Sequence, residues 1–277
     1  MKSESQEVVA GVPNLKPHPP LQSFASPDLL DPDLQFFLER ACLLLCDWLA
    51  KSSKGTPLPQ LDQMPDIAPN RTGIKSEILF RDLQIIVDGA YKPSHPGSLA
   101  HLDPPPITAS IVADLISAGL NNNLLADELS PSLSNLERKL CKWFSEKIGM
   151  NSSGGGVIAS GGSLSNLNAL VVARKNSGLE YDPSAVIIAS ADSHVSLIKA
   201  RKVMGLKEDA LQIIPTNNDG QISLLLLEEK LKSLKSQGKR CFAIVATAGT
   251  TIRGAVDPIK DLANICLKEG LWLHVDA

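Results

Sequence analysis

Residues 185–200, AVIIASADSHVSLIKA, place an unbroken apolar run directly before a helical pattern. An unbroken run, unlike an alternating one, is typical of a strand in a sheet that is buried on both faces. Five strands are predicted, in VIAS (157–160), AVIIAS (185–190), LQIIP (211–215), CFAIVAT (241–247) and LWLHVDA (271–277). Helices are predicted to begin near Ser163, His194, Leu224 and Pro258. This alternation predicts an α/β fold, a mainly parallel sheet with helices on both faces.

Before this region the chain has helical patterns joined by proline-rich connections. Asp31 followed by Pro32 is a helix-start signal, and apolar residues recur at helical spacing over 34–48. The same signal at Asp257 and Pro258 indicates a structural, capping role for Asp257. Further helices are predicted over 76–88, 107–120 and 134–147. We expect a disordered leader over 1–24, an N-terminal helical segment with a proline-rich connection over 25–105, and a large domain over 106–277.

The composition argues against several classes of function. Hydrophobic residues make up 43% of the 277 residues and charged residues 21%, as in globular proteins, and the formal net charge is −3. Nucleic-acid binding has no electrostatic support, because no long basic block is present. The apolar runs are too short to span a bilayer and the first residues do not resemble a secretory signal, so a cytoplasmic protein without membrane contact is expected.

The cysteines are interpreted as buried small hydrophobic residues in a reducing compartment. Cys42 and Cys46 lie four apart on a helical pattern, which could suggest a metal pair. No histidine lies near them in the sequence to complete a site. No metal site is therefore predicted.

Polar residues follow several predicted strands, and in parallel sheets ligands bind at the carboxyl ends of strands. The glycines of SGGSLSN (160–166) and the helix start after them suit a phosphate, although a tight turn without a ligand fits this stretch as well. His194 follows the second predicted strand. A histidine at this place has either a functional role or a structural one, in capping or packing. Thr247 and Gly249 lie at the end of the fourth, and Asp276 near the end of the last.

Together these groups match the needs of a phosphorylated aromatic cofactor. A carboxylate such as Asp276 could keep a ring nitrogen protonated, through a charge-assisted bond worth about 1.5–3 kcal/mol. The imidazole of His194 could lie over the ring, and Thr247 could hold a ring substituent. Pyridoxal phosphate has a phosphate, a pyridine nitrogen and a phenolic oxygen in matching roles. A nucleotide-binding α/β protein stays open on the pattern alone, but it leaves His194 and Asp276 unexplained.

Several stretches resemble the group II pyridoxal-phosphate amino-acid decarboxylases. They are SGGSLSNLNALVVAR (160–174), SADSHVSLIKA (190–200), TAGTTIRGAVDPI (247–259) and WLHVDA (272–277), and the similarity, which begins near Ser94, includes SHPGSLAHLDPPP (94–106) and SPSLSNLE (130–137). That family includes enzymes acting on glutamate, aspartate, cysteine sulfinate, aromatic amino acids and 2,4-diaminobutyrate. The resemblance implies a truncated large domain of fold type I and decarboxylation of an L-amino acid with pyridoxal phosphate.

The resemblance also implies roles for individual residues. It places the cofactor phosphate at Gly162 and Ser163. It stacks His194 on the ring, sets Thr247 beside the ring, and pairs Asp276 with the pyridine nitrogen. His194 and Asp276 are thereby the expected catalytic residues.

Substrate and subunit contacts follow from the same resemblance. His101 and Asp103 fall where the family lines its substrate pocket. Asp103 could favour a cationic side chain such as that of diaminobutyrate, or it could be a turn residue among prolines. The helix over 34–48 looks like the family's N-terminal segment, which packs across the dimer, so a homodimer is expected.

In the family, the lysine that binds the cofactor and a small C-terminal domain lie beyond the HVDA stretch. None of the lysines here, including Lys199, occupies that position. The chain is therefore expected to be the front part of a decarboxylase, inactive or nearly so alone. The alternatives are a non-catalytic piece that binds the cofactor weakly or pairs with a full-length subunit, and a different pyridoxal-phosphate enzyme such as an aminotransferase or a desulfurase.

Overall fold

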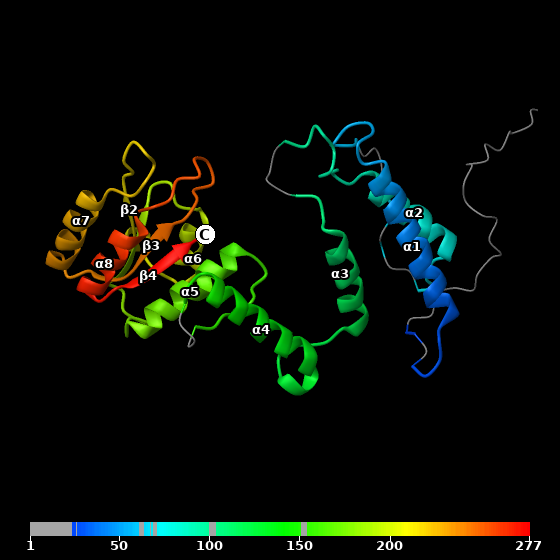
Figure 1. The fold of residues 1–277 in the computed structure, drawn as a ribbon, viewed down its shortest axis with the longest axis horizontal. Coiled ribbons are helices and arrows are strands. Elements are labelled where there is room, and N and C mark those ends of the chain that lie inside the picture. Colours follow the sequence, from blue (N-terminus) through cyan, green and yellow to red (C-terminus); the bar gives the residue numbers. More distant parts are fainter. Residues whose placement is uncertain are drawn as a thin grey trace, which may run out of the picture. The chain divides into compact units, whose positions relative to one another are not determined.

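The computed structural model describes residues 24–25, 27–60, 64–66, 68, 71–99, 104–150 and 154–277. The chain divides into two compact units, Met1–Asn121 and Asn122–Ala277 (Figure 1). The boundary predicted at residues 105 and 106 stays a prediction. The leader predicted over 1–24 lies almost wholly outside the described residues.

The first unit contains the predicted helices α1 (Pro32–Ala50), α2 (Ser76–Asp88) and α3 (Thr108–Leu120). The side chain of Asp31 caps α1, because its Oδ1 accepts hydrogen bonds from the backbone N–H groups of Asp33 and Leu34, at 3.0 Å each. Phe37 of α1 packs on Phe80 of α2 with ring centroids 5.2 Å apart, and both are buried. These helix predictions are confirmed.

The prediction of buried cysteines is wrong for two of them. Cys42 and Cys46 are exposed on α1, Cys141 and Cys241 are half-buried, and Cys266 is buried. The reason is that α1 buries Phe37 alone among its residues, so the face that carries the two cysteines is not covered within the unit.

Among the described residues, no helix is long and apolar enough to cross a membrane.

The second unit is an α/β domain. Its strands are β1 (Ala185–Ser190), β2 (Leu211–Ile214), β3 (Arg240–Thr247) and β4 (Trp272–Asp276). Its helices are α4 (Pro131–Lys147), α5 (Gly162–Asn176), α6 (Ser196–Val203), α7 (Leu224–Ser236) and α8 (Ile259–Glu269), with single 3₁₀ turns at η1 (Asp127–Leu129) and η2 (Glu208–Ala210). The strands are all parallel, in the order β2-β1-β3-β4.

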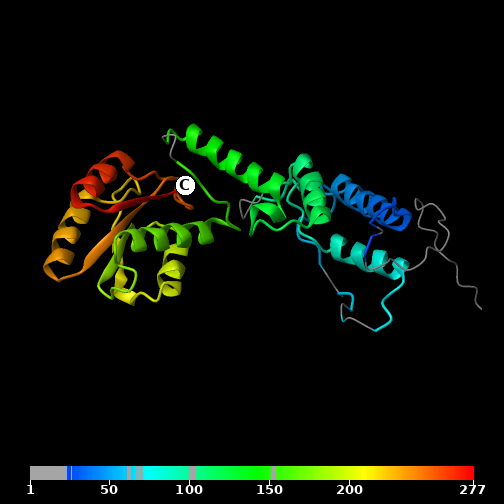
Figure 2. The ribbon, with the colours of Figure 1, turned by 90° about the horizontal axis from the view of Figure 1, so that it is seen from below.

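Helices cover both faces of this sheet. Figure 2 shows α5 and α6 over one face, and α7 and α8 over the other. Every residue of β1 is buried, as are the last six of β3. The unbroken apolar strands therefore form the central layer, and the predicted α/β architecture is confirmed.

One predicted strand does not form, and one predicted helix begins earlier than expected. Residues 157–160, VIAS, form no strand, and Val157 and Ile158 are exposed. A strand needs a neighbour for its backbone groups, and the described sheet offers none to this segment, where the N–H of Ile158 instead donates to Glu137 Oε1 at 2.9 Å. Helix α4 begins at Pro131, before the predicted Ser134, because a proline is favoured in the first helical turn.

Asp257 is structural, but it does not cap a helix. Pro258 is the residue before α8, and no side chain caps that helix. The buried Asp257 carboxylate instead accepts hydrogen bonds from the backbone N–H groups of Ile222 and Thr247, each at 2.7 Å. The N–H of Asp257 in turn donates to the carbonyl of Thr247 at 2.9 Å. Asp257 thus fixes the end of β3, where a predicted site residue lies.

Candidate active site

A cavity of about 310 Å³ lies at the carboxyl ends of β1, β3 and β4. It is lined by Gly162, Ser163, Asn166, Asp192, His194, Thr247, Gly249, Thr251, Asp276 and Ala277. All the residues predicted to bind the cofactor are among them. Sequence reasoning singled out neither Asn166 nor Asp192. His101 and Asp103, predicted for the substrate, lie outside the described residues.

The N-terminus of α5 forms one wall of this cavity. Gly161 precedes the helix with a φ of 156°, a conformation that favours glycine. No side chain caps the helix, so its first N–H groups are not taken by a cap. A Cβ at Gly161 or Gly162 would meet nothing within 4 Å, which leaves open space beside the helix start. This arrangement suits an anion such as a phosphate.

Thr247 contributes a hydroxyl that lacks a hydrogen-bond partner. Its side chain is 4% exposed, and its Oγ1 has no partner among the described residues. The backbone around it is held by Asp257 and by pairing with β4, where Thr247 lies opposite Asp276. A buried polar atom without a partner is rare in folded proteins. The hydroxyl is therefore available to a polar substituent of a ligand in the cavity.

Asp276 belongs to a hydrogen-bonded cluster between β4 and α5. Asn166 Nδ2 lies 3.0 Å from Asp276 Oδ2, and Asn166 Oδ1 lies 2.7 Å from His274 Nε2. His274 and Asp276 are two residues apart on β4 and so lie on the same face of the sheet. Burial lowers the pKa of His274 below its ordinary value, and the nearby Asp276 carboxylate opposes this only in part.

His194 lies in the loop between β1 and α6, at the mouth of the cavity. Its Nδ1 accepts the N–H of Ser196 at 3.2 Å, which leaves Nε2 to carry the proton when the ring is neutral. The ring is otherwise exposed, so one face can cover a bound ligand. Nearby, Asp192 forms an ion pair with Arg253, with 3.5 Å between Oδ2 and Nε.

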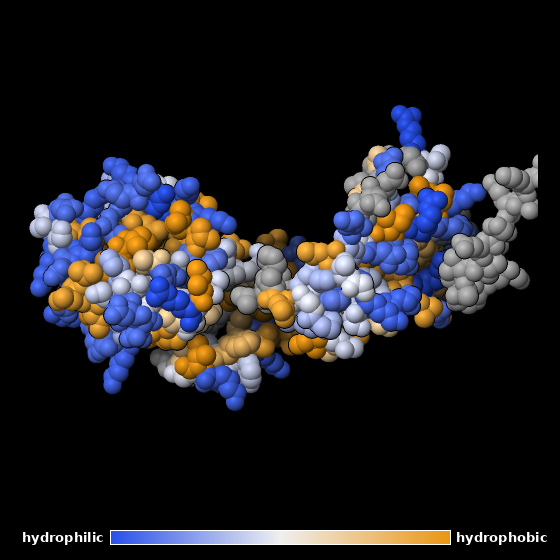
Figure 3. All heavy atoms as spheres, turned by 90° about the horizontal axis from the view of Figure 1, so that it is seen from above, coloured by the Kyte–Doolittle hydropathy of each residue, from blue (hydrophilic) through white to orange (hydrophobic). Residues whose placement is uncertain are grey.

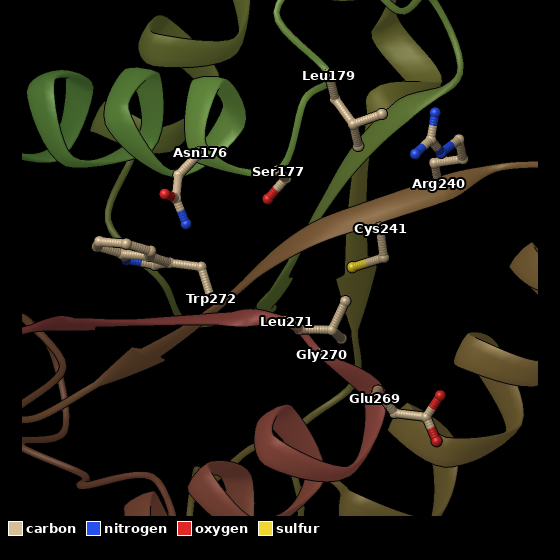
Figure 4. Close-up of a pocket in the computed structure, with 9 residues that line it drawn as sticks. All are labelled: Asn176, Ser177, Leu179, Arg240, Cys241, Glu269, Gly270, Leu271 and Trp272. Carbon is tan, nitrogen blue, oxygen red and sulfur yellow. The ribbon is translucent and has the colours of Figure 1, made fainter.

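A second cavity, of about 320 Å³, lies at the amino ends of β3 and β4. Figure 4 shows Cys241 and Trp272 from these strands at its edge, with Asn176 beside Trp272. Burial raises the pKa of Cys241 to about 12, so its thiol is not ionised at neutral pH and is a poor nucleophile. Since parallel sheets bind ligands at their carboxyl ends, the first cavity is the candidate active site.

Residues 57–277 match the model of the pyridoxal-dependent decarboxylase conserved domain. The chain belongs to this family. It is 30% identical over 256 residues to an acidic amino acid decarboxylase of Mus musculus, covering 87% of this chain and 46% of that protein. It is 29% identical over 268 residues to an L-2,4-diaminobutyrate decarboxylase of Acinetobacter baumannii, covering 88% and 52%. The chain thus spans about half the length of the curated relatives it matches.

Solved structures support the fold. The glutamate decarboxylase domain of a diaminobutyrate-pyruvate transaminase and L-2,4-diaminobutyrate decarboxylase from Vibrio parahaemolyticus superposes with a TM-score of 0.84 at 23% identity. The match covers 92% of this chain and 60% of that one. The chain therefore shares the fold of the matching part of this decarboxylase domain.

Membership of the family assigns pyridoxal phosphate as the cofactor. The cavity fits this molecule on three points: an uncapped helix start for the phosphate, an unpartnered hydroxyl at Thr247, and a carboxylate at Asp276 for the ring nitrogen. The individual roles of these residues stay predictions.

Proposed function

We propose that this chain carries the cofactor-binding part of an enzyme that decarboxylates an L-amino acid with pyridoxal phosphate. The observation that carries the proposal is the convergence of the α5 N-terminus, the Thr247 hydroxyl and the Asp276 carboxylate on one cavity, in a member of this family. Each of these groups matches one part of the cofactor.

The mechanism assigns one task to each residue. When bound, pyridoxal phosphate supplies an electron sink for the electron pair left behind as the substrate carboxylate leaves as carbon dioxide. The N–H groups at Gly162 and Ser163 hold the phosphate, and His194 covers one face of the ring. Asp276 keeps a proton on the ring nitrogen, and Thr247 Oγ1 bonds a ring substituent. These contacts fix the ring and maintain its positive charge.

A second proposal concerns residues 1–277 as a separate piece: it binds the cofactor without catalysing decarboxylation. The supporting observation is that no lysine is among the described residues that line the cavity. A covalent bond to the cofactor needs a lysine amine at that place. Purified residues 1–277 should therefore bind pyridoxal phosphate reversibly and release no carbon dioxide from amino acids. Measurable release would contradict this second proposal.

Replacing Ser163 with aspartate should abolish most of this binding. A carboxylate in the first turn of α5 suits the helix dipole, so the fold should be kept. It would repel the cofactor phosphate and weaken binding by about 1–3 kcal/mol, or roughly 5- to 150-fold. Affinity can be measured by equilibrium dialysis with absorbance detection.

The matched control is Ser165→Asp, which adds the same charge to the same helix outside the cavity lining. It should retain most of the wild-type affinity. Equal losses in the two variants would mean that the α5 N-terminus does not hold the phosphate.

We further propose that Asp103 favours a cationic substrate side chain such as that of diaminobutyrate. Relatives of this chain include decarboxylases named for acidic amino acids and for 2,4-diaminobutyrate. Family membership alone therefore does not decide which of these substrate classes the chain accepts. An acidic pocket residue attracts a cation and repels a second carboxylate.

We also propose that the functional form is a homodimer that uses the apolar face of α3. This helix buries none of its residues, and Val112, Leu115, Ile116 and Leu120 are each 45–56% exposed. Their spacing places them along one side of the helix. Figure 3 shows apolar residues at the surface of both units. A contiguous apolar stripe of this kind is typical of an interaction surface.

Replacing Ile116 with glutamate should shift the protein from dimer to monomer, because the substitution buries a charge in the contact. The measurement is the molar mass by size-exclusion chromatography with light scattering. Ser117→Glu adds the same charge to the neighbouring side of α3 and should leave the mass unchanged. A monomeric wild type would overturn the dimer proposal.

A further inference from the structure

Asn166 is a buried polar residue that the mechanism above does not use. It is 4% exposed and lies on the side of α5 that faces the sheet. Its Nδ2 lies 2.9 Å from Ser196 Oγ and 3.0 Å from Asp276 Oδ2, and its Oδ1 lies 2.7 Å from His274 Nε2. One amide therefore connects α5, the start of α6 and the end of β4.

The chemistry of the partners fixes the orientation of this amide. An ionised carboxylate only accepts hydrogen bonds, so the NH₂ group of Asn166 must face Asp276. The amide oxygen then faces His274, whose Nε2 must carry a proton and donate it. Both N–H groups of the amide are engaged, one to Ser196 and one to Asp276. The cluster has a single consistent arrangement, and since burial of His274 favours its neutral ring, that ring is the tautomer with its proton on Nε2.

A neutral donor has a particular advantage beside Asp276. An arginine or lysine in the same place would also hold the carboxylate, but its positive charge would compete with a protonated pyridine nitrogen. The amide of Asn166 restricts rotation of the carboxylate and leaves its negative charge in place. Because the bond uses Oδ2, the other carboxylate oxygen, Oδ1, is left for a ligand.

We propose that Asn166 is a positioning residue, which holds Asp276 by Oδ2 so that Oδ1 meets the ring nitrogen of pyridoxal phosphate. This inference rests on the proposed function, since it needs the cofactor in the cavity. It predicts that the effect of Asn166 on binding depends on the ring nitrogen itself.

The test compares two ligands on the same protein: pyridoxal phosphate, and an analogue that has C–H in place of the ring nitrogen. In Asn166→Ala, the affinity for pyridoxal phosphate should fall about tenfold, while that for the analogue should stay near its wild-type value. A purely structural role of Asn166 would weaken both ligands by the same factor. The matched control is Asn168→Ala, which removes an exposed asparagine from the same helix and should change neither affinity.

A second variant covers the case in which Asn166→Ala fails to fold. Asn166→Asp keeps the size of the side chain and places a second carboxylate next to Asp276, so the pair shares a proton and Asp276 loses part of its charge. The affinity for pyridoxal phosphate should then rise with increasing pH across the neutral range, and the affinity for the analogue should not follow it.

The outcomes separate the two proposals. Binding of pyridoxal phosphate by the wild type, with parallel losses for both ligands in the variants, would overturn the role of Asn166 alone. A wild type that binds neither ligand would overturn the proposed function and this inference with it.

Discussion

Replacing Asp257 with alanine should lower the free energy of unfolding by about 2–6 kcal/mol. The substitution leaves the backbone N–H groups of Ile222 and Thr247 buried without an acceptor, at about 1–3 kcal/mol each. This loss is a large part of the roughly 5–15 kcal/mol that is typical of the stability of a domain. Urea denaturation followed by circular dichroism measures it.

The control is Glu229→Ala, which removes an exposed carboxylate from α7 and should change stability by roughly 0.5 kcal/mol or less. Asp257→Asn offers a graded test. It keeps the shape but has one accepting oxygen, so it should lose about half as much as alanine. If Asp257→Ala unfolds at the urea concentration of the wild type, the two hydrogen bonds do not hold the end of β3 in solution.

The sheet was predictable because its strands are buried on both faces. A largely apolar run such as 185–190 has no polar face to turn toward solvent, so it is expected in a central strand. The structure buries every residue of that run. VIAS contains the same residue types on a shorter stretch, yet it forms no strand in the described sheet. Composition specifies which segments can pair, whereas the presence of a neighbour decides which segments do pair.

Residues at strand ends were also predictable, because parallel strands bring their carboxyl ends to one edge of the sheet. Thr247 and Asp276 meet at the cavity for this reason. The cluster around Asn166 was missed because its hydrogen bonds connect residues that are distant in the sequence. His274 and Asp276 lie 108 and 110 positions after Asn166. A signal was present: Asn166, Leu170 and Ala173 are spaced as one buried helix face, which places a polar side chain against the sheet.

Asp276→Asn should weaken the binding of pyridoxal phosphate about ten- to a hundredfold and remove the proton from its ring nitrogen. The charge-assisted bond that this change removes is worth about 1.5–3 kcal/mol. The oxygen of the new amide can still accept the hydrogen bond from Asn166 Nδ2, so the cluster should persist. Its NH₂ group then faces the ring, and a donor in that place favours a pyridine nitrogen without a proton.

Nitrogen NMR of the bound cofactor, labelled at the ring nitrogen, separates this effect from a general loss of the site. The wild type should show the chemical shift of a protonated ring at neutral pH, and Asp276→Asn that of an unprotonated one. Asp219→Asn makes the same chemical change in an exposed turn and should leave both shift and affinity at wild-type values. A protonated ring in both proteins would mean that another group supplies the charge. Asp276 would then contribute to binding without controlling the electron sink.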